Sequence, residues 1–504
     1  MPPKRVTILG AGFAGLSAAA TLAKEGYQVK VYDKNAKPGG RAQNFSAQGF
    51  TFDMGPTWYW MPDIFEDFFA YFGKKVSDYY ELVRISPSYR MFFGKDDYID
   101  LPTSMDEVYD LFEKLEPGSS IKLKKFLADA EYKYNLGIKE IVRKPAKRFS
   151  EFLEYRIVSG IFRLDFFKSI TTYIKQNFKN HKLIKLLEFP VIFLGATPQN
   201  TPALYSLMNY ADIKLGTWYP MGGMYSVVNG MVELGKSMGV EYHLGKPVDK
   251  INIHNRLAHS IQLNGSAVET DYVIGAADYN HIEANLLDPP YRNYSAKYWE
   301  NRDMAPSALL FYLGINKKLK NLEHHNLFFD EDFEQHAAEI YNHPTWPTKP
   351  ALYVSCSSKT DATVAPEGHE NLIILIPVAP GLEDTNAIKE HYFEMSIERL
   401  EKITGQSIKG HIVYKRFYAQ SDFIRDYNSF KGNAYGLANT LRQTAFLKPK
   451  IHNRKVRNIF YAGQLTTPGP GVPPTIISGQ VAAKEIMKVS PFMNEKQQHH
   501  ETSF

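Results

Sequence analysis

Cysteine is nearly absent from this chain of 504 residues, in which only Cys356 occurs. A single thiol excludes an internal disulfide framework and any iron–sulfur cluster built on cysteines. The histidines show no metal-ligand spacing, and no Ser/His/Asp arrangement is visible. We therefore expect no bound metal, and we assign no catalytic acid or base from the sequence.

Long apolar runs and strong net charge are absent as well. No uninterrupted apolar stretch approaches the length that spans a bilayer, and no signal-peptide core precedes the apolar residues 6–9. The net charge is only +5, and no basic run matches a nucleic-acid-binding motif. We expect a protein of the cytoplasm or of the inner face of the cell membrane, without a nucleic-acid partner.

A glycine-rich turn is the first clear motif. Gly10, Gly12 and Gly15 lie between a predicted strand and a predicted helix, and Asp33 ends the next strand. Gly12 lets the backbone approach a pyrophosphate, whose charge is stabilised by the helix N-terminus. Asp33 can accept hydrogen bonds from ribose hydroxyls. The pattern predicts a dinucleotide site, with a purely structural glycine turn as the alternative.

Further glycine-rich segments suggest which dinucleotide binds. Residues 38–42 read Pro-Gly-Gly-Arg-Ala, and residues 460–474 form a second glycine- and proline-rich segment before a predicted helix. These segments resemble the two flavin motifs of the flavin amine oxidase and phytoene desaturase superfamily, although that family usually has Glu at the position of Asp33. The resemblance implies FAD as the cofactor. A ligand-free glycine/proline loop is the alternative for the second segment.

Three more matches narrow the resemblance to carotenoid desaturases of the bacterial phytoene desaturase type: residues 359–368, residues 432–446 and residues 219–224. It covers nearly the whole chain and is weakest from about residue 130 to 195. It implies an α/β fold, in which a doubly wound FAD domain is joined to a sheet-containing substrate domain and a helical insert.

The resemblance also implies the reaction. A carotenoid would be oxidised with introduction of a C=C bond, and oxygen or a membrane quinone would reoxidise the cofactor. The sequence of residues 469–479 resembles desaturases of the 3,4 bond more than it resembles phytoene desaturases. These enzymes act beside a 1-hydroxylated end of the carotenoid. The alternatives are a phytoene desaturase, a flavin-dependent carotenoid isomerase or saturase, and a non-enzymatic prenyl-lipid escort protein.

The expected site residues follow from the motifs and the resemblance together. In the family, Val248 would contact adenine, Ala276 and Ala277 would close the cleft, and residues 471–473 would lie under the isoalloxazine. The expected cofactor residues are Gly10, Gly12, Ala14, Gly15, Asp33, Lys34, Gly39, Gly40, Arg41, Gly55, Pro56, Thr57, Trp58, Val248, Ala276, Ala277, Gly463, Gly471, Val472 and Pro473. Tyr219, Tyr435 and Phe446 are candidates to line the substrate tunnel, with core packing as the alternative.

The expected organisation places the FAD domain in residues 1–75, 222–285 and 450–490, and the substrate domain in residues 76–104 and 286–449. Residues 105–221 form a helical region, and residues 491–504 are expected to be disordered. Between residues 139 and 185, twelve Lys/Arg face four acids, giving 12 − 4 = +8, with aromatic and aliphatic side chains interleaved up to residue 194. This pattern favours attachment to a membrane surface over a core helix with a solvated basic face.

Overall fold

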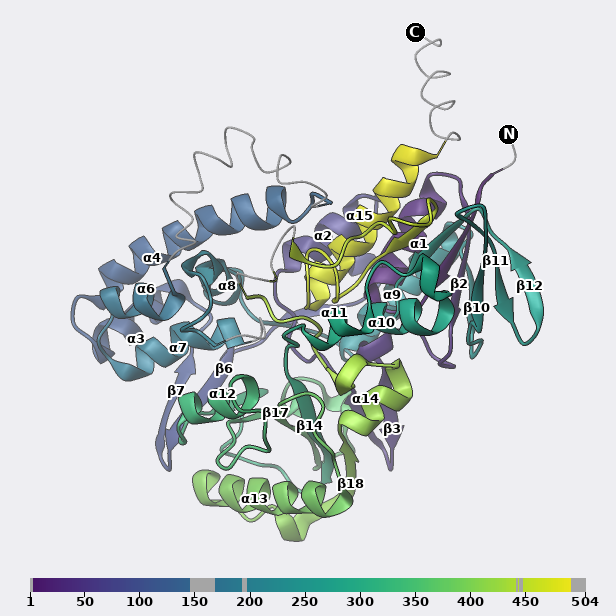
Figure 1. Ribbon diagram of the computed structural model, residues 1–504. Coiled ribbons are helices and arrows are strands. Elements are labelled where there is room, and N and C mark those ends of the chain that lie inside the picture. Colours follow the sequence, from purple (N-terminus) through teal and green to yellow (C-terminus); the bar gives the residue numbers. More distant parts are fainter. Residues whose placement is uncertain (1–2, 146–167, 193–196, 441–442, 444–446, 491–504) are drawn as a thin grey trace.

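A five-stranded parallel sheet brings together segments from both ends and the middle of the chain (Figure 1). The computed structural model describes residues 3–145, 168–192, 197–440, 443 and 447–490. The strand order is β19-β13-β1-β2-β9. The strands are β1 (Arg5–Leu9), β2 (Gln28–Asp33), β9 (Glu241–Leu244), β13 (Tyr272–Gly275) and β19 (Ile459–Tyr461).

Helices cover one face of this sheet. They are α1 (Phe13–Lys24), α9 (Met224–Ser237) and α15 (Val472–Val489). The packing of α1 against α15 is close, because a Cβ atom on Gly479 would lie 2.2 Å from the carbonyl oxygen of Ala14. The glycine- and proline-rich segment was expected to precede this last helix, but α15 already begins at Val472, within the segment. Prolines are tolerated in a first helical turn, where the backbone N–H has no intrahelical acceptor.

A small antiparallel sheet packs against the other face. Its strands are β10 (Lys250–His254), β11 (Leu257–Leu263) and β12 (Ser266–Glu269). Ile251 and Ile261 share a core with Leu9 and Val273, which point to this side of the parallel sheet. The parallel sheet is therefore covered on both faces, which confirms the predicted doubly wound α/β class.

A seven-stranded sheet forms the second large unit, in the order β18-β14-β17-β16-β15-β6-β7. Its strands are β6 (Tyr89–Gly94), β7 (Asp97–Leu101), β14 (Ser307–Ile315), β15 (His325–Phe328), β16 (Leu352–Ser355), β17 (Glu370–Val378) and β18 (Ile412–Tyr418). Along β14, Leu309 and Phe311 face one hydrophobic core, whereas Leu310 and Tyr312 face another. This alternation is the period of two that a sheet buried on both faces requires.

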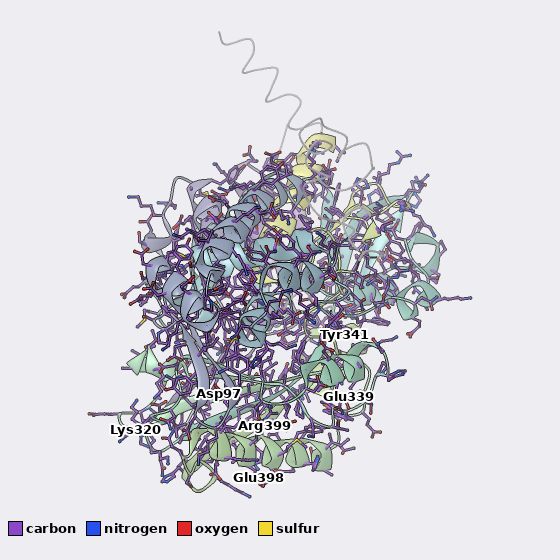
Figure 2. All side chains as sticks on the ribbon, turned by 90° about the vertical axis from the view of Figure 1, so that its left-hand side faces the viewer. Asp97, Lys320, Glu339, Tyr341, Glu398 and Arg399 are labelled. Carbon is purple, nitrogen blue, oxygen red and sulfur yellow. The ribbon has the colours of Figure 1, made fainter. Side chains whose placement is uncertain are left out.

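Helices of different lengths surround the seven-stranded sheet. The outer core is closed by α13 (Asn386–Thr404), which lies at the base of the molecule in Figure 1, and Figure 2 shows Glu398 and Arg399 on this helix. The same view shows Glu339 and Tyr341 near it, on α12 (Phe333–Tyr341). The helix α14 (Gln420–Tyr427) follows β18 and leads back to the parallel sheet.

A helical region adjoins both units. Its helices include α2 (Pro62–Ala70), α3 (Met105–Leu115), α4 (Ser119–Tyr134), α6 (Ile170–Asn177), α7 (His181–Ile192) and α8 (Leu207–Asn209). Among the described helices, none is long and apolar enough to cross a membrane. The prediction that apolar side chains of this region face a bilayer is wrong for Ile170 and Phe189, which are buried in the core. Residues 146–167, 193–196 and the predicted tail lie outside the described residues.

Candidate cofactor and substrate site

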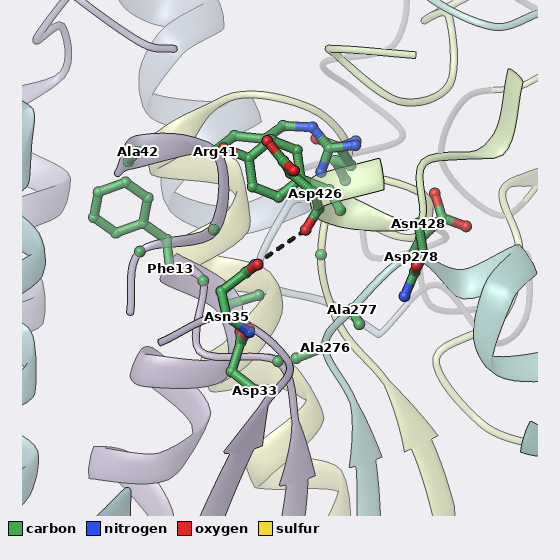
Figure 3. Close-up of a pocket in the computed structure, with 18 of the residues that line it drawn as sticks. Phe13, Asp33, Asn35, Arg41, Ala42, Ala276, Ala277, Asp278, Asp426 and Asn428 are labelled. Atoms are coloured by element: carbon green, nitrogen blue, oxygen red, sulfur yellow. Dashed lines mark hydrogen bonds between the residues drawn. The ribbon is translucent and has the colours of Figure 1, made fainter. Parts of the chain in front are cut away.

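A cavity of about 700 Å³ opens beyond the carboxyl ends of β1, β2 and β13. Figure 3 shows Asp33 at the end of β2 and Ala276 just past the end of β13. In a parallel α/β sheet, this edge is where ligands bind. The predicted cofactor residues that line the cavity are Gly10, Gly12, Ala14, Asp33, Lys34, Gly39, Gly40, Arg41, Gly55, Pro56, Val248, Ala276, Ala277, Gly463, Gly471 and Val472.

The glycines of the first turn have different tasks. Gly10 has a φ of +110°, which favours glycine, and a Cβ there would lie 2.9 Å from the backbone of Ala276. Gly15 does not line the cavity; it lets α1 approach the turn, since a Cβ would lie 1.9 Å from the carbonyl oxygen of Gly10. A Cβ on Gly12 would meet no atom within 4 Å, so the chain leaves open space in front of the α1 N-terminus. A pyrophosphate fits this arrangement.

Asp33 is positioned for a ribose. One carboxylate oxygen accepts a hydrogen bond from the N–H of Ala11 at 2.8 Å, and the other accepts one from the N–H of Asn35 at 2.8 Å. Burial raises the pKa of Asp33, and these backbone hydrogen bonds oppose that shift. An ionised carboxylate has about four acceptor sites, so two remain for ribose hydroxyls.

Arg41 lines the cavity, but its guanidinium is held by a neighbouring loop. Its Nη2 donates to the hydroxyl of Ser429 at 2.5 Å and to the carbonyl oxygen of Asn433 at 3.1 Å. The Nε atom of Arg41 is buried without a hydrogen-bond partner in the described part of the chain. Burial lowers the pKa of Arg41, while Asp278 opposes that shift. A bound anion would supply the missing acceptor.

The C-terminal motif closes the cavity from the side of α15. Gly471, Val472 and Thr475 line it, so the N-termini of α1 and α15 open onto one space. Gly463 also lines it and donates its N–H to Ser478 at 3.0 Å. Pro473 lies in the first turn of α15 without lining the cavity. Two helix N-termini on one cavity suit a diphosphate.

The opposite wall of the cavity is apolar. The seven-stranded sheet contributes Ala308, Leu310 and Leu375 to it. Of the three predicted tunnel residues, Tyr435 lines the cavity, Phe446 lies outside the described residues, and Tyr219 does not line it. The hydroxyl of Tyr219 instead donates to Asp361 at 3.3 Å.

A buried polar cluster lies behind this wall, and the sequence motifs did not predict it. Thr57 and Trp58 do not line the cavity, although both were expected to contact the cofactor. The hydroxyl of Tyr353 lies 2.7 Å from Thr57 Oγ1 and 2.7 Å from His325 Nδ1. The indole of Trp58 stacks on the His325 ring, with centroids 4.0 Å apart. The pairing of β15 with β16 brings His325 and Tyr353 together, and no short-range sequence pattern indicates this pairing.

The fold and the cavity define a dinucleotide-binding oxidoreductase with a separate substrate sheet. Comparison with known families agrees: residues 13–487 match the model of the flavin containing amine oxidoreductases. The chain belongs to this family, and FAD is its cofactor.

The relatives are more specific. A carotenoid 3,4-desaturase of Haloarcula japonica is 39% identical over 96% of this chain and 98% of its own length. A zeta-carotene-forming phytoene desaturase of Myxococcus xanthus is 30% identical, over 96% of this chain and 94% of its own length. A 4,4'-diapophytoene desaturase of Staphylococcus aureus is 30% identical, over 96% and 99%.

Solved structures share the fold at low identity. An oxidoreductase from Methanosarcina mazei matches with a TM-score of 0.63 at 17% identity, covering 96% of this chain and 100% of that chain. Putrescine oxidase bound to putrescine matches with a TM-score of 0.58 at 15% identity, over 96% and 99%.

Proposed function

We propose that the protein is an FAD-dependent carotenoid desaturase. The observation that carries this proposal is the composition of the cavity, in which a dinucleotide cradle faces an apolar wall made by Ala308, Leu310 and Leu375. A hydrocarbon offers few groups for hydrogen bonding, so its site should be lined by apolar side chains. The carotenoid desaturases among the relatives support the same substrate class.

The cofactor and the chain divide the work. FAD, when bound, accepts the two electrons of a C–H bond, which no side chain here can do. The α1 and α15 N-termini would hold its diphosphate, and Asp33 would hold its ribose. The apolar wall would hold a C–C bond of the substrate and keep water away from it.

We place the reaction at the 3,4 bond of a carotenoid with a 1-hydroxylated end. The glycine- and proline-rich ending at residues 469–479 and the 39% identity to a carotenoid 3,4-desaturase support this choice over phytoene. Product mass is the test: desaturation removes two hydrogens, isomerisation removes none, and saturation adds two. The absorption spectrum of the purified protein excludes an escort role if it shows stoichiometric flavin.

The partners beyond the substrate follow from the same proposal. Oxygen or a membrane quinone would reoxidise the cofactor, since the sequence shows one dinucleotide fingerprint and the family assigns it to FAD. A water-insoluble substrate also favours attachment to the inner face of the cell membrane. The exposed lysines Lys175 and Lys179 on and after α6 support such a contact.

A further inference from the structure

We propose that Thr57, Tyr353 and His325 form a path that removes the proton released during desaturation, with His325 as the final acceptor. This inference rests on the proposed function and deepens it. Introducing one C=C bond breaks two C–H bonds. One hydrogen leaves with both bonding electrons, which FAD accepts. The other leaves as a proton, and the electrons of its bond form the new π bond, so the chain must supply a proton acceptor.

The cavity wall itself supplies no base on the apolar side. Ala308, Leu310 and Leu375 cannot accept a proton. Asp33, which also lines the cavity, ends β2, and its free acceptor sites would serve the ribose. Asp278, Asp426 and His281 line the cavity too. Asp278 accepts hydrogen bonds from two backbone N–H groups, Asp426 accepts one from a tyrosine hydroxyl, and both ring nitrogens of His281 lie beside asparagine amides. We therefore assign the proton acceptor to the substrate sheet, behind the apolar wall.

The path begins one residue behind that wall, since Thr57 itself does not line the cavity. Thr57 directly follows Pro56, which lines the cavity. Tyr353 on β16 is paired with Leu375 on β17, so their side chains share one face of the sheet. That face is the one that Leu375 presents to the cavity.

The path continues along the same face. His325 is paired with Ser355, two residues from Tyr353, so the imidazole and the phenol again lie on one side. The Tyr353 hydroxyl lies 2.7 Å from Thr57 Oγ1 and 2.7 Å from His325 Nδ1. The three side chains therefore form an unbroken hydrogen-bonded chain. Thr57 can donate to Tyr353 while Tyr353 donates to His325, which is the direction that proton removal requires.

His325 is prepared to receive a proton. It is fully buried, and burial together with the neighbouring His324 lowers its pKa well below the usual value, so the imidazole is neutral. A weak base suffices, because a C–H bond beside a cationic carbon is strongly acidic. The indole of Trp58, stacked at 4.0 Å, favours the imidazolium while it exists. The Nε2 atom of His325 has no hydrogen-bond partner in the described part of the chain, so no other contact competes for the ring.

The test uses the FAD-loaded protein with three variants, Thr57→Val, Tyr353→Phe and His325→Gln, of which the first two remove only a hydroxyl from the path. The readouts are FAD content, KM, and the rate of flavin reduction in a single anaerobic turnover, in H₂O and in D₂O. Matched controls are Tyr392→Phe, whose hydroxyl donates to the carbonyl oxygen of Pro347, and His336→Gln, a buried histidine in the substrate unit.

We expect FAD content and KM to be retained in all three path variants, while flavin reduction slows roughly 10²- to 10⁴-fold, the usual contribution of general base catalysis. The Tyr353→Phe/His325→Gln double variant should be about as slow as the slower single variant, because residues of one path act as a unit. The solvent isotope effect of the wild type should be lost in the variants.

Two outcomes overturn the proposal. One is flavin reduction at the wild-type rate in both Tyr353→Phe and Thr57→Val, and the other is a double variant in which the losses of the two single variants multiply. The wild type is assayed first: if it oxidises no carotenoid, the proposed function fails, whereas an active wild type with unimpaired variants overturns the proton path alone.

Discussion

A Cβ atom on Gly15 would lie 1.9 Å from the carbonyl oxygen of Gly10. Gly15 therefore permits the contact between α1 and the turn on which the parallel sheet is built. Gly12, three residues earlier, faces only the cavity, with no atom within 4 Å of its Cβ position. The same motif thus contains one glycine that the fold requires and one that faces the space where we propose that the diphosphate binds.

Substitution of these two glycines should separate folding from cofactor binding. Gly12→Val is expected to keep the unfolding midpoint of the FAD-free protein and to lose FAD, because the added methyl groups occupy the diphosphate space. Gly15→Val is expected to lose the fold itself. Circular dichroism and flavin content measure the two effects. A Gly12→Val protein with stoichiometric FAD would contradict the placement of the cofactor.

The sequence predicted the parallel sheet and most of the cavity because short motifs encode them. Glycines, Asp33 and a helix N-terminus lie within one strand-helix-strand unit, so their spacing is local. The hydrogen-bonded chain from Thr57 to His325 could not be predicted in this way. Its members lie up to 296 positions apart, between Thr57 and Tyr353, and Tyr353 meets His325 only through the pairing of β15 with β16.

Asp212 should make stability depend on pH. Burial raises its pKa to about 7, although Tyr89 donates a hydrogen bond to it. The folded state therefore binds a proton more tightly than the unfolded state, and the contribution of Asp212 is lost as pH rises from about 4 to above 7. Relative to Asp212→Asn, the wild type should lose roughly 4 kcal/mol over this range. Urea unfolding of both proteins at several pH values measures the difference, and parallel curves would contradict it.

His336 should change the pH dependence of stability in the opposite direction to Asp212. Its burial lowers its pKa to about 4, so the unfolded state binds the proton more tightly. Its contribution to stability is present above pH 6.5 and decreases as the pH falls toward 4. At pH 5, the wild type should have lost roughly 2 kcal/mol relative to His336→Gln. The same unfolding series tests this, and a difference that is constant between pH 7 and 5 would exclude it.

Charge reversal tests the proposed membrane contact. Lys175 and Lys179 are exposed, whereas Lys182 forms an ion pair with Asp97. Lys175→Glu with Lys179→Glu should weaken co-sedimentation with anionic liposomes at least 10-fold, since each basic residue near such a surface contributes about 1 kcal/mol. Lys320→Glu with Lys402→Glu, exposed positions on the substrate unit, is the matched control. Equal binding by both pairs would favour a core helix with a solvated basic face.

The most direct test of the account is an anaerobic reaction of the FAD-loaded protein with a 1-hydroxylated carotenoid and, separately, with phytoene, each with a quinone as acceptor. The account predicts that the hydroxylated substrate loses two hydrogens by mass and gains a C=C bond at the 3,4 position. Oxidation of phytoene alone would contradict the end-group assignment. Oxidation of neither substrate by a protein that retains its flavin would contradict the desaturase function itself.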